Sequence, residues 1–145
     1  MSDGLWLLIT RKGQAFVPTM ARTEVGFYMG VEPVEVIDMS DPERVEQALV
    51  RAVMRGNPEV PTPTRGDFPE DPLLKHANVK SMATFERSAH SWKVSKQGAN
   101  YVIGPYRLGK YGGSEEDQQK MEAIPAEKGI EAVVHRLVHR ALNGA

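Results

Sequence analysis

The chain has 145 residues, a net charge of −1, 41% hydrophobic and 26% charged residues. These proportions fit a single globular domain and exclude a chain too polar to fold. No apolar run is long enough for a membrane-spanning helix, and the N-terminus MSDGLWLLITRKG lacks the basic start and long apolar run of a secretory signal, so we expect a cytoplasmic protein. The absence of cysteine excludes disulfides, thiolate metal sites and cysteine nucleophiles.

The first third of the chain predicts strands followed by a helix. LWLLIT and QAFVPT are β-type segments joined by a polar turn at Gly13, as in a hairpin. VGFYMG and PVEVID continue the β pattern because they are rich in branched and aromatic residues. A helix then runs to Arg55, with either a Ser40–Glu43 capping box or Asp41 as its cap.

The middle of the chain predicts a connection and one further strand. Residues 57–72 contain five prolines, which fix φ and remove backbone donors, so this segment is expected to be extended and non-helical. Residues 79–88 are predicted to form a strand.

The last part repeats the order of the first. Strands are predicted at SWKVSK and NYVIGPYRL around a turn at Gly98, with a short strand in KMEAI. The final helix has an apolar face formed by Ile130, Val133, Val134, Leu137, Val138 and Ala141.

An internal repeat explains this order. ITRKGQAFV (9–17) aligns with VSKQGANYV (94–102), and VEQALVRAVMR (45–55) aligns with IEAVVHRLVHR (130–140), both at an offset of 85. We therefore predict one domain of the α+β class. Two β-rich-then-helix units, 5–56 and 90–142, would build an antiparallel sheet with two main helices around a pseudo-two-fold axis.

GPYRLGKYGG (104–113) resembles a phosphate-binding loop without being one. Such a loop ends in Lys-Ser or Lys-Thr and opens directly into a helix, whereas Tyr111 and two glycines follow Lys110 here. The segment is instead interpreted as the descent of a strand into a glycine-rich loop.

Catalytic and metal-binding patterns are weak. Glu131, His135 and His139 share one stripe of the last helix, but no H-E-x-x-H pattern or outside ligand accompanies them, so a solvated face is the preferred interpretation and no metal or other cofactor is expected. Ser88, His90 and Ser91 lack a nucleophile-elbow pattern. We expect a protein that is not an enzyme.

Two oppositely charged regions are candidate binding surfaces. Residues 31–72 hold ten acidic and four basic residues, and exposed carboxylates there suit capture of a basic protein. On PVEVID, Glu35 is expected to face solvent, opposite Val34 and Val36. The acidic candidates, with one aromatic anchor, are Glu32, Glu35, Asp38, Asp67, Phe68, Glu70 and Asp71.

The alternative surface is basic and aromatic. Residues 73–113 hold seven basic residues and one acidic residue. Rings that stack on bases and cations that meet phosphates are typical of nucleic-acid binding, so this function stays open. The candidates are Lys96, Tyr106, Arg107, Lys110 and Tyr111.

The run SWKVSKQGANYVIGPYRLGKYGG followed by IEAVVHRLVHRAL resembles bacterial immunity proteins of contact-dependent growth inhibition systems. Those proteins bind and block a cognate toxin domain, often a nuclease. The resemblance implies a cytoplasmic protein whose partner is a protein toxin and not a membrane. It assigns no family residue to a position in this chain.

Overall fold

The computed structural model describes residues 3–64, 66–67, 69–108, 114–116 and 118–143. The strands are β1 (Gly4–Arg11), β2 (Gln14–Thr23), β3 (Tyr28–Asp38), β4 (Glu59–Val60), β5 (Ala89–Gln97), β6 (Asn100–Leu108), β7 (Ser114–Glu116) and β8 (Glu122–Pro125). The helices are α1 (Pro42–Arg55), α2 (Pro72–Ala77), α3 (Met82–Arg87) and α4 (Ile130–Leu142), with short 3₁₀ turns at Gln118–Lys120 and Ala126–Lys128.

The strands form one sheet in the order β3-β2-β1-β5-β6-β7. Neighbours along this path are antiparallel, β8 pairs antiparallel with β6, and β4 adds a short parallel pairing to β2. The hairpins β1–β2 and β5–β6 meet at the centre, where β1 pairs with β5 along its whole length from Gly4 to Arg11. The expected α+β class and antiparallel sheet are confirmed.

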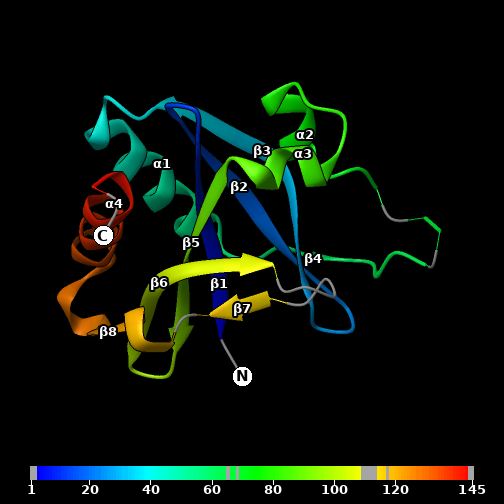
Figure 1. The fold of residues 1–145 in the computed structure, drawn as a ribbon. Helices are drawn as coiled ribbons and strands as arrows, with labels where there is room; N and C mark the ends of the chain where they lie inside the picture. The colour runs from blue at the N-terminus through cyan, green and yellow to red at the C-terminus, as the bar shows by residue number, and fades with distance from the viewer. Residues whose placement is uncertain (1–2, 65, 68, 109–113, 117, 144–145) are drawn as a thin grey trace.

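The larger hydrophobic cluster lies between the sheet and the helices α1 and α4, which pack together on one face (Figure 1). Every second residue of the central strands points into it, including Trp6 and Leu8 of β1 and Trp92 and Val94 of β5. The apolar face predicted for α4 is confirmed: Val133, Val134, Leu137, Val138 and Ala141 are buried and Ile130 is partly buried.

The opposite face of the sheet carries the short helices α2 and α3 (Figure 1). A smaller cluster forms there from Ile9, Phe16 and Val34 of the strands, Leu73 and Leu74 of α2, and Phe85 of α3. Because these two helices cover only part of the face, the rest stays open beside them.

Residues 79–88 do not form the predicted strand. Met82–Arg87 is the helix α3, whose N-cap Ser81 accepts a hydrogen bond from the Thr84 amide at 3.2 Å. The preceding helix, α2, was not predicted either; Asp71 is its N-cap and Pro72 occupies its first position. Short helices of six residues owe their stability to tertiary packing, here through Phe85, so propensity alone misassigns them.

The helix α1 begins after one of the two residues predicted as its cap. Asp41, not Ser40, is the cap: its carboxylate accepts a hydrogen bond from the Arg44 amide at 3.3 Å, and Pro42 follows. Gly56, with φ of 74°, ends the helix.

Asn57 joins β1 and β2 where the two strands separate. Their pairing runs only from Ile9–Phe16 to Arg11–Gln14. Beyond it, the Asn57 side-chain amide donates to the carbonyls of Leu5 and Met20 at 2.8 and 2.9 Å, and its oxygen accepts from the Leu5 amide at 3.3 Å. One side chain therefore replaces a missing rung of backbone hydrogen bonds.

The predicted repeat agrees with the structure in outline only. Two hairpins are present, and Arg51 of α1 and Arg136 of α4 each contact a glutamate on a strand. The hairpin turns differ, because β1–β2 turns at Lys12-Gly13 whereas β5–β6 turns at Gly98-Ala99, so Gly13 and Gly98 occupy different turn positions. The equivalence of the two halves stays a prediction.

Candidate partner-binding groove

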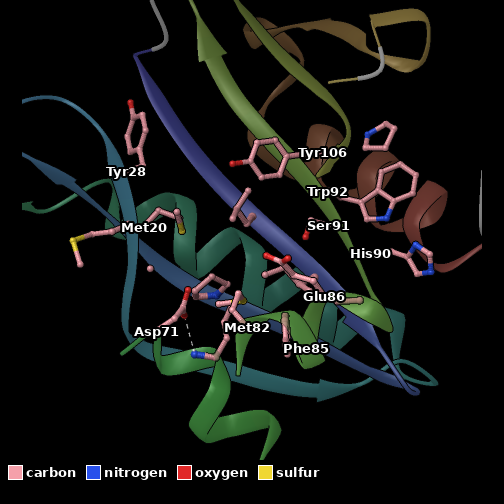
Figure 2. Close-up of a pocket in the computed structure, with 18 of the residues that line it drawn as sticks. Met20, Tyr28, Asp71, Met82, Phe85, Glu86, His90, Ser91, Trp92 and Tyr106 are labelled. Atoms are coloured by element: carbon pink, nitrogen blue, oxygen red, sulfur yellow. Dashed lines mark hydrogen bonds between the residues drawn. The ribbon is translucent and has the colours of Figure 1, made fainter. Parts of the chain in front are cut away.

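A groove of about 990 Å³ lies on the open part of the sheet face beside α2 and α3 (Figure 2). Its floor is apolar, with Leu7 and Ile9 of β1 and Pro18 and Met20 of β2. Such a concave, mostly apolar surface with a few polar groups is the usual form of a binding site.

The two long sides of the groove differ in chemistry. Asp71 and Glu86 stand on the side nearest α2 and α3, and Tyr28 and Tyr106 stand across from them (Figure 2). Ser91 and His90 of β5 and Lys120 also line the groove. Tyrosine and carboxylate side chains together can hold a polar or cationic group above an apolar floor.

Packing fixes the α3 side of this groove. The Phe85 ring meets the Phe16 ring edge-on, with centroids 5.7 Å apart and planes at 79°. The Arg11 guanidinium lies 5.6 Å from the Phe85 centroid, and its Nε donates to the Ser88 hydroxyl at 2.9 Å. Glu86, next to Phe85 on α3, is thereby held at the rim of the groove.

Burial changes the acidity of both carboxyl groups. The Asp71 carboxylate accepts the Leu73 amide at 3.0 Å, yet burial dominates and raises the pKa of Asp71 above its ordinary value. Burial likewise raises the pKa of Glu86. Both groups therefore sit where ionisation is less favourable than in water.

Three of the acidic candidates are occupied within the molecule. Glu32 meets His76 of α2 at 3.0 Å, and this hydrogen bond lowers the pKa of Glu32. Asp38 accepts the Ser40 amide at 2.8 Å, which lowers the pKa of Asp38. Glu35 is 2.6 Å from Arg51, which lowers the pKa of Glu35.

Glu35 lies opposite the buried Val34, as expected, but it is not fully exposed and Val36 is not buried. Glu35 is on the α1 side of the sheet and is partly covered by its ion pairs with Arg51 and Arg55, while Val36 is 37% exposed. The alternation of residues along the strand could not show that the arginines of α1 contact this edge strand.

The remaining acidic candidates lie along the connection before α2. Asp67 and Glu70 are exposed, and Asp67 accepts a hydrogen bond from the Thr64 hydroxyl. Phe68 lies outside the described residues. Of the acidic candidates that the structure describes, Asp71 alone lines the groove, so this set is not one surface.

The basic-aromatic candidates are not one surface either. Lys96 lies at the β5–β6 turn, where its ammonium donates to the Gly98 carbonyl and lies 5.8 Å from the Tyr101 centroid. Tyr106 lies at the other end of β6, in the groove, five rungs or roughly 17 Å away. Arg107 pairs through its backbone with Glu115. The Arg107 side chain, Lys110 and Tyr111 lie outside the described residues.

The histidines of the last helix and Ser88 contact other side chains of the molecule. His135 is exposed and contacts Glu46 of α1 at 2.9 Å, and His139 contacts Asn143. Within the described part of the chain, no group of three or more histidine or carboxylate side chains could hold a metal ion. Ser88 is engaged by Arg11. Nor does any helix of that part have the length and apolar character to cross a membrane.

Several groove residues escaped the sequence analysis. Phe27 and Tyr28 belong to a β-type segment, and Met20 to another, so pattern marked them as ordinary strand residues. Glu86 fell within the segment misassigned as a strand. Its one available signal was charge, because it is the single acidic residue in the basic region 73–113.

Comparison with known proteins gives the fold alone. No family model matches this chain, and no curated protein matches it. A solved protein of unknown function from Neisseria meningitidis matches with a TM-score of 0.57 and 12% identity, covering 98% of this chain and 94% of the other. A chain of a CdiA-CT/CdiI toxin and immunity complex from Yersinia pseudotuberculosis matches with a TM-score of 0.52 and 11% identity, covering 94% and 95%. This chain shares their fold along nearly its whole length.

Proposed function

We propose that this protein is an immunity protein, which binds a cognate toxin domain and blocks it without catalysis. The observation that supports the proposal is the likeness, over 94% of this chain, to a chain of a toxin and immunity complex. The bacterial contact-dependent growth inhibition system is the setting in which we expect it to act, in the cytoplasm. A toxin nuclease with a basic cleft is the kind of partner that we expect.

The groove is the surface on which we expect the toxin to bind. Aromatic side chains and methionine supply most of the energy in protein interfaces when they line a concave surface, and Met20, Phe27, Tyr28, Met82 and Tyr106 do so here. The Phe27 side chain is 39% exposed, and Val25 beside it is 73% exposed. The apolar end of the β2–β3 hairpin thus lies next to the apolar groove. Exposed apolar surface of this kind is typical of sites where another protein binds.

The test uses a candidate toxin domain, taken from the products of the genes beside this one. Co-expression of the two proteins should restore growth, and the two should copurify in equal amounts. Phe27→Ala should weaken the complex about tenfold or more, as loss of an aromatic anchor does.

Met54→Ala is the matched control. Met54 is 75% exposed on α1, on the opposite face of the sheet, so its removal should leave affinity unchanged. A toxin domain that neither copurifies nor is neutralised would refute the proposed function. An intact complex with Phe27→Ala but a weakened one with Met54→Ala would refute the groove as its surface.

A further inference from the structure

The groove holds two carboxyl groups without a cationic partner. In the described part of the chain, Glu32, Glu35, Glu46 and Glu122 each contact a histidine or an arginine, whereas neither Asp71 nor Glu86 makes an ion pair. Their immediate neighbours in the groove are apolar, namely Leu73, Met82 and Phe85. These two carboxyl groups therefore lie beside hydrocarbon and outside the ion pairs that the described residues form.

Other titratable groups line the groove farther along. His90 belongs to β5, Lys120 precedes β8, and Tyr28 and Tyr106 stand across from the carboxyl groups. Lys120 uses its carbonyl to accept a hydrogen bond from Arg140 at 2.8 Å. No ion pair joins His90 or Lys120 to Asp71 or Glu86 among the described residues.

A lysine or arginine side chain fits this arrangement. Its methylene stem can lie on the apolar floor and its cationic head can meet the carboxylates. Tyrosine rings across the groove attract a cation through their faces. Since the Asp71 carboxyl group is already partly desolvated in the free protein, binding of a cation there costs less further desolvation of that carboxyl group than it would at a fully exposed one.

We propose that the toxin inserts a lysine or arginine, flanked by apolar residues, into this groove, where Asp71 and Glu86 bind its cationic head. This inference rests on the proposed function. The occupant is thus defined by chemistry: a cationic head on an apolar stem. This sharpens the expected charge complementarity, because it moves the contact from the exposed acidic cluster to two carboxyl groups of the groove: Asp71, which is partly buried, and Glu86 at the rim.

Binding of that cation should depend on pH. A carboxyl group whose pKa is raised in the free protein is protonated first as the pH falls, and the neutral form does not attract a cation. Affinity should therefore be full near neutral pH and fall as the pH drops toward the raised pKa values. His90 also lines the groove, so the His90→Gln variant separates any contribution of this side chain from that of the two carboxyl groups.

A first experiment needs no toxin. The full-length protein is titrated with butylguanidinium and followed by NMR, with pentanoate as an anion of similar length and free guanidinium as a cation without a stem. Butylguanidinium should shift groove residues with a dissociation constant on the order of 1 mM, and both controls should bind more weakly. Equal shifts with pentanoate would overturn the inference.

Conservative variants locate the site. Asp71→Asn keeps a residue that caps helices well, and Glu86→Gln keeps the shape of its side chain, so both should fold. The double variant should lose butylguanidinium binding and its pH dependence. Glu70→Gln is the matched control, because Glu70 is exposed on the same segment and does not line the groove.

The affinity of the same variants for the candidate toxin domain is then measured. The double variant should weaken the complex at least tenfold and flatten its pH dependence, while Glu70→Gln should bind as the unmodified protein does. A toxin that binds the double variant with full affinity would refute the inference and leave the immunity function standing. Absence of any complex with the unmodified protein would refute the immunity function, while the small-cation result would still decide the chemistry of the groove.

Discussion

Replacing Asn57 tests how the sheet is held where β1 and β2 separate. Its side chain makes three hydrogen bonds, two as donor to the carbonyls of Leu5 and Met20 and one as acceptor from the Leu5 amide. A typical hydrogen bond contributes about 1 kcal/mol net, and a partly buried site admits some water, so Asn57→Ala should lower the free energy of unfolding by roughly 1–3 kcal/mol.

Asn57→Asp separates hydrogen bonding from packing. The new carboxylate keeps the shape of the side chain and can still accept a hydrogen bond from the Leu5 amide. Its second oxygen, however, replaces the nitrogen that donated to the carbonyls of Leu5 and Met20, so it repels both carbonyl oxygens. We therefore expect Asn57→Asp to be less stable than Asn57→Ala at neutral pH. The difference should shrink at low pH, because a protonated carboxyl can donate to one carbonyl.

Urea unfolding of the three proteins, at neutral pH and near pH 4, measures these free energies with a check on the slope of each transition. The reasoning fails if the aspartate variant is as stable as the asparagine protein, or if the gap between the two variants does not change with pH.

Three further predictions concern stability. Leu137 is fully buried on α4, so Leu137→Ala should lower the free energy of unfolding by about 2–5 kcal/mol in urea; a loss below 1 kcal/mol would contradict the assigned core. The Arg51 contact holds the pKa of Glu35 below its ordinary value, so its stabilisation is present above the ordinary pKa and is lost as the pH falls through the lowered one. Because the pair is partly exposed, Glu35→Gln should cost at most about 1 kcal/mol at neutral pH and nothing in strong acid, and a constant cost at both would argue against the ion pair. A Cβ added at Gly4 would lie 2.5 Å from the buried Trp6 ring, so thermal unfolding of Gly4→Ala should show a loss of about 1–3 kcal/mol, and an unchanged transition would show that the ring moves freely.

Periodicity predicted most of the sheet and both long helices. The apolar run LWLLIT is a central strand with buried residues on both faces, and the i, i+3, i+4 spacing of 130–141 gives the one buried face of α4. KMEAI was rightly placed as a short strand, since β8 pairs with β6 there. These elements are long or regular enough that local pattern and tertiary packing agree.

Where elements are short, tertiary packing decides whether a segment forms a helix or a strand, and the sequence pattern alone could not predict it. The six residues of α3 are helical because Phe85 packs on Phe16 and Ser81 caps the turn, not because of any apolar period. The groove was unpredictable for the same reason, since Asp71 and Glu86 line one groove only once α2 and α3 have folded onto the sheet. The nearest sequence signal was Asp71 itself, which was among the acidic candidates; it is partly buried in the groove, and its role in binding stays a prediction.

Alternation along β1 and β5 also divides the sequence into two sets of positions with different freedom to change. Leu8 of β1 and Val94 of β5 are fully buried under α1 and α4, whereas Leu7 and Ser91 of the same strands are half-buried in the groove. A substitution at the second kind of position alters the groove while the main core stays intact. Neighbouring codons would thus evolve under separate constraints, so the lining of the groove can change without a new fold.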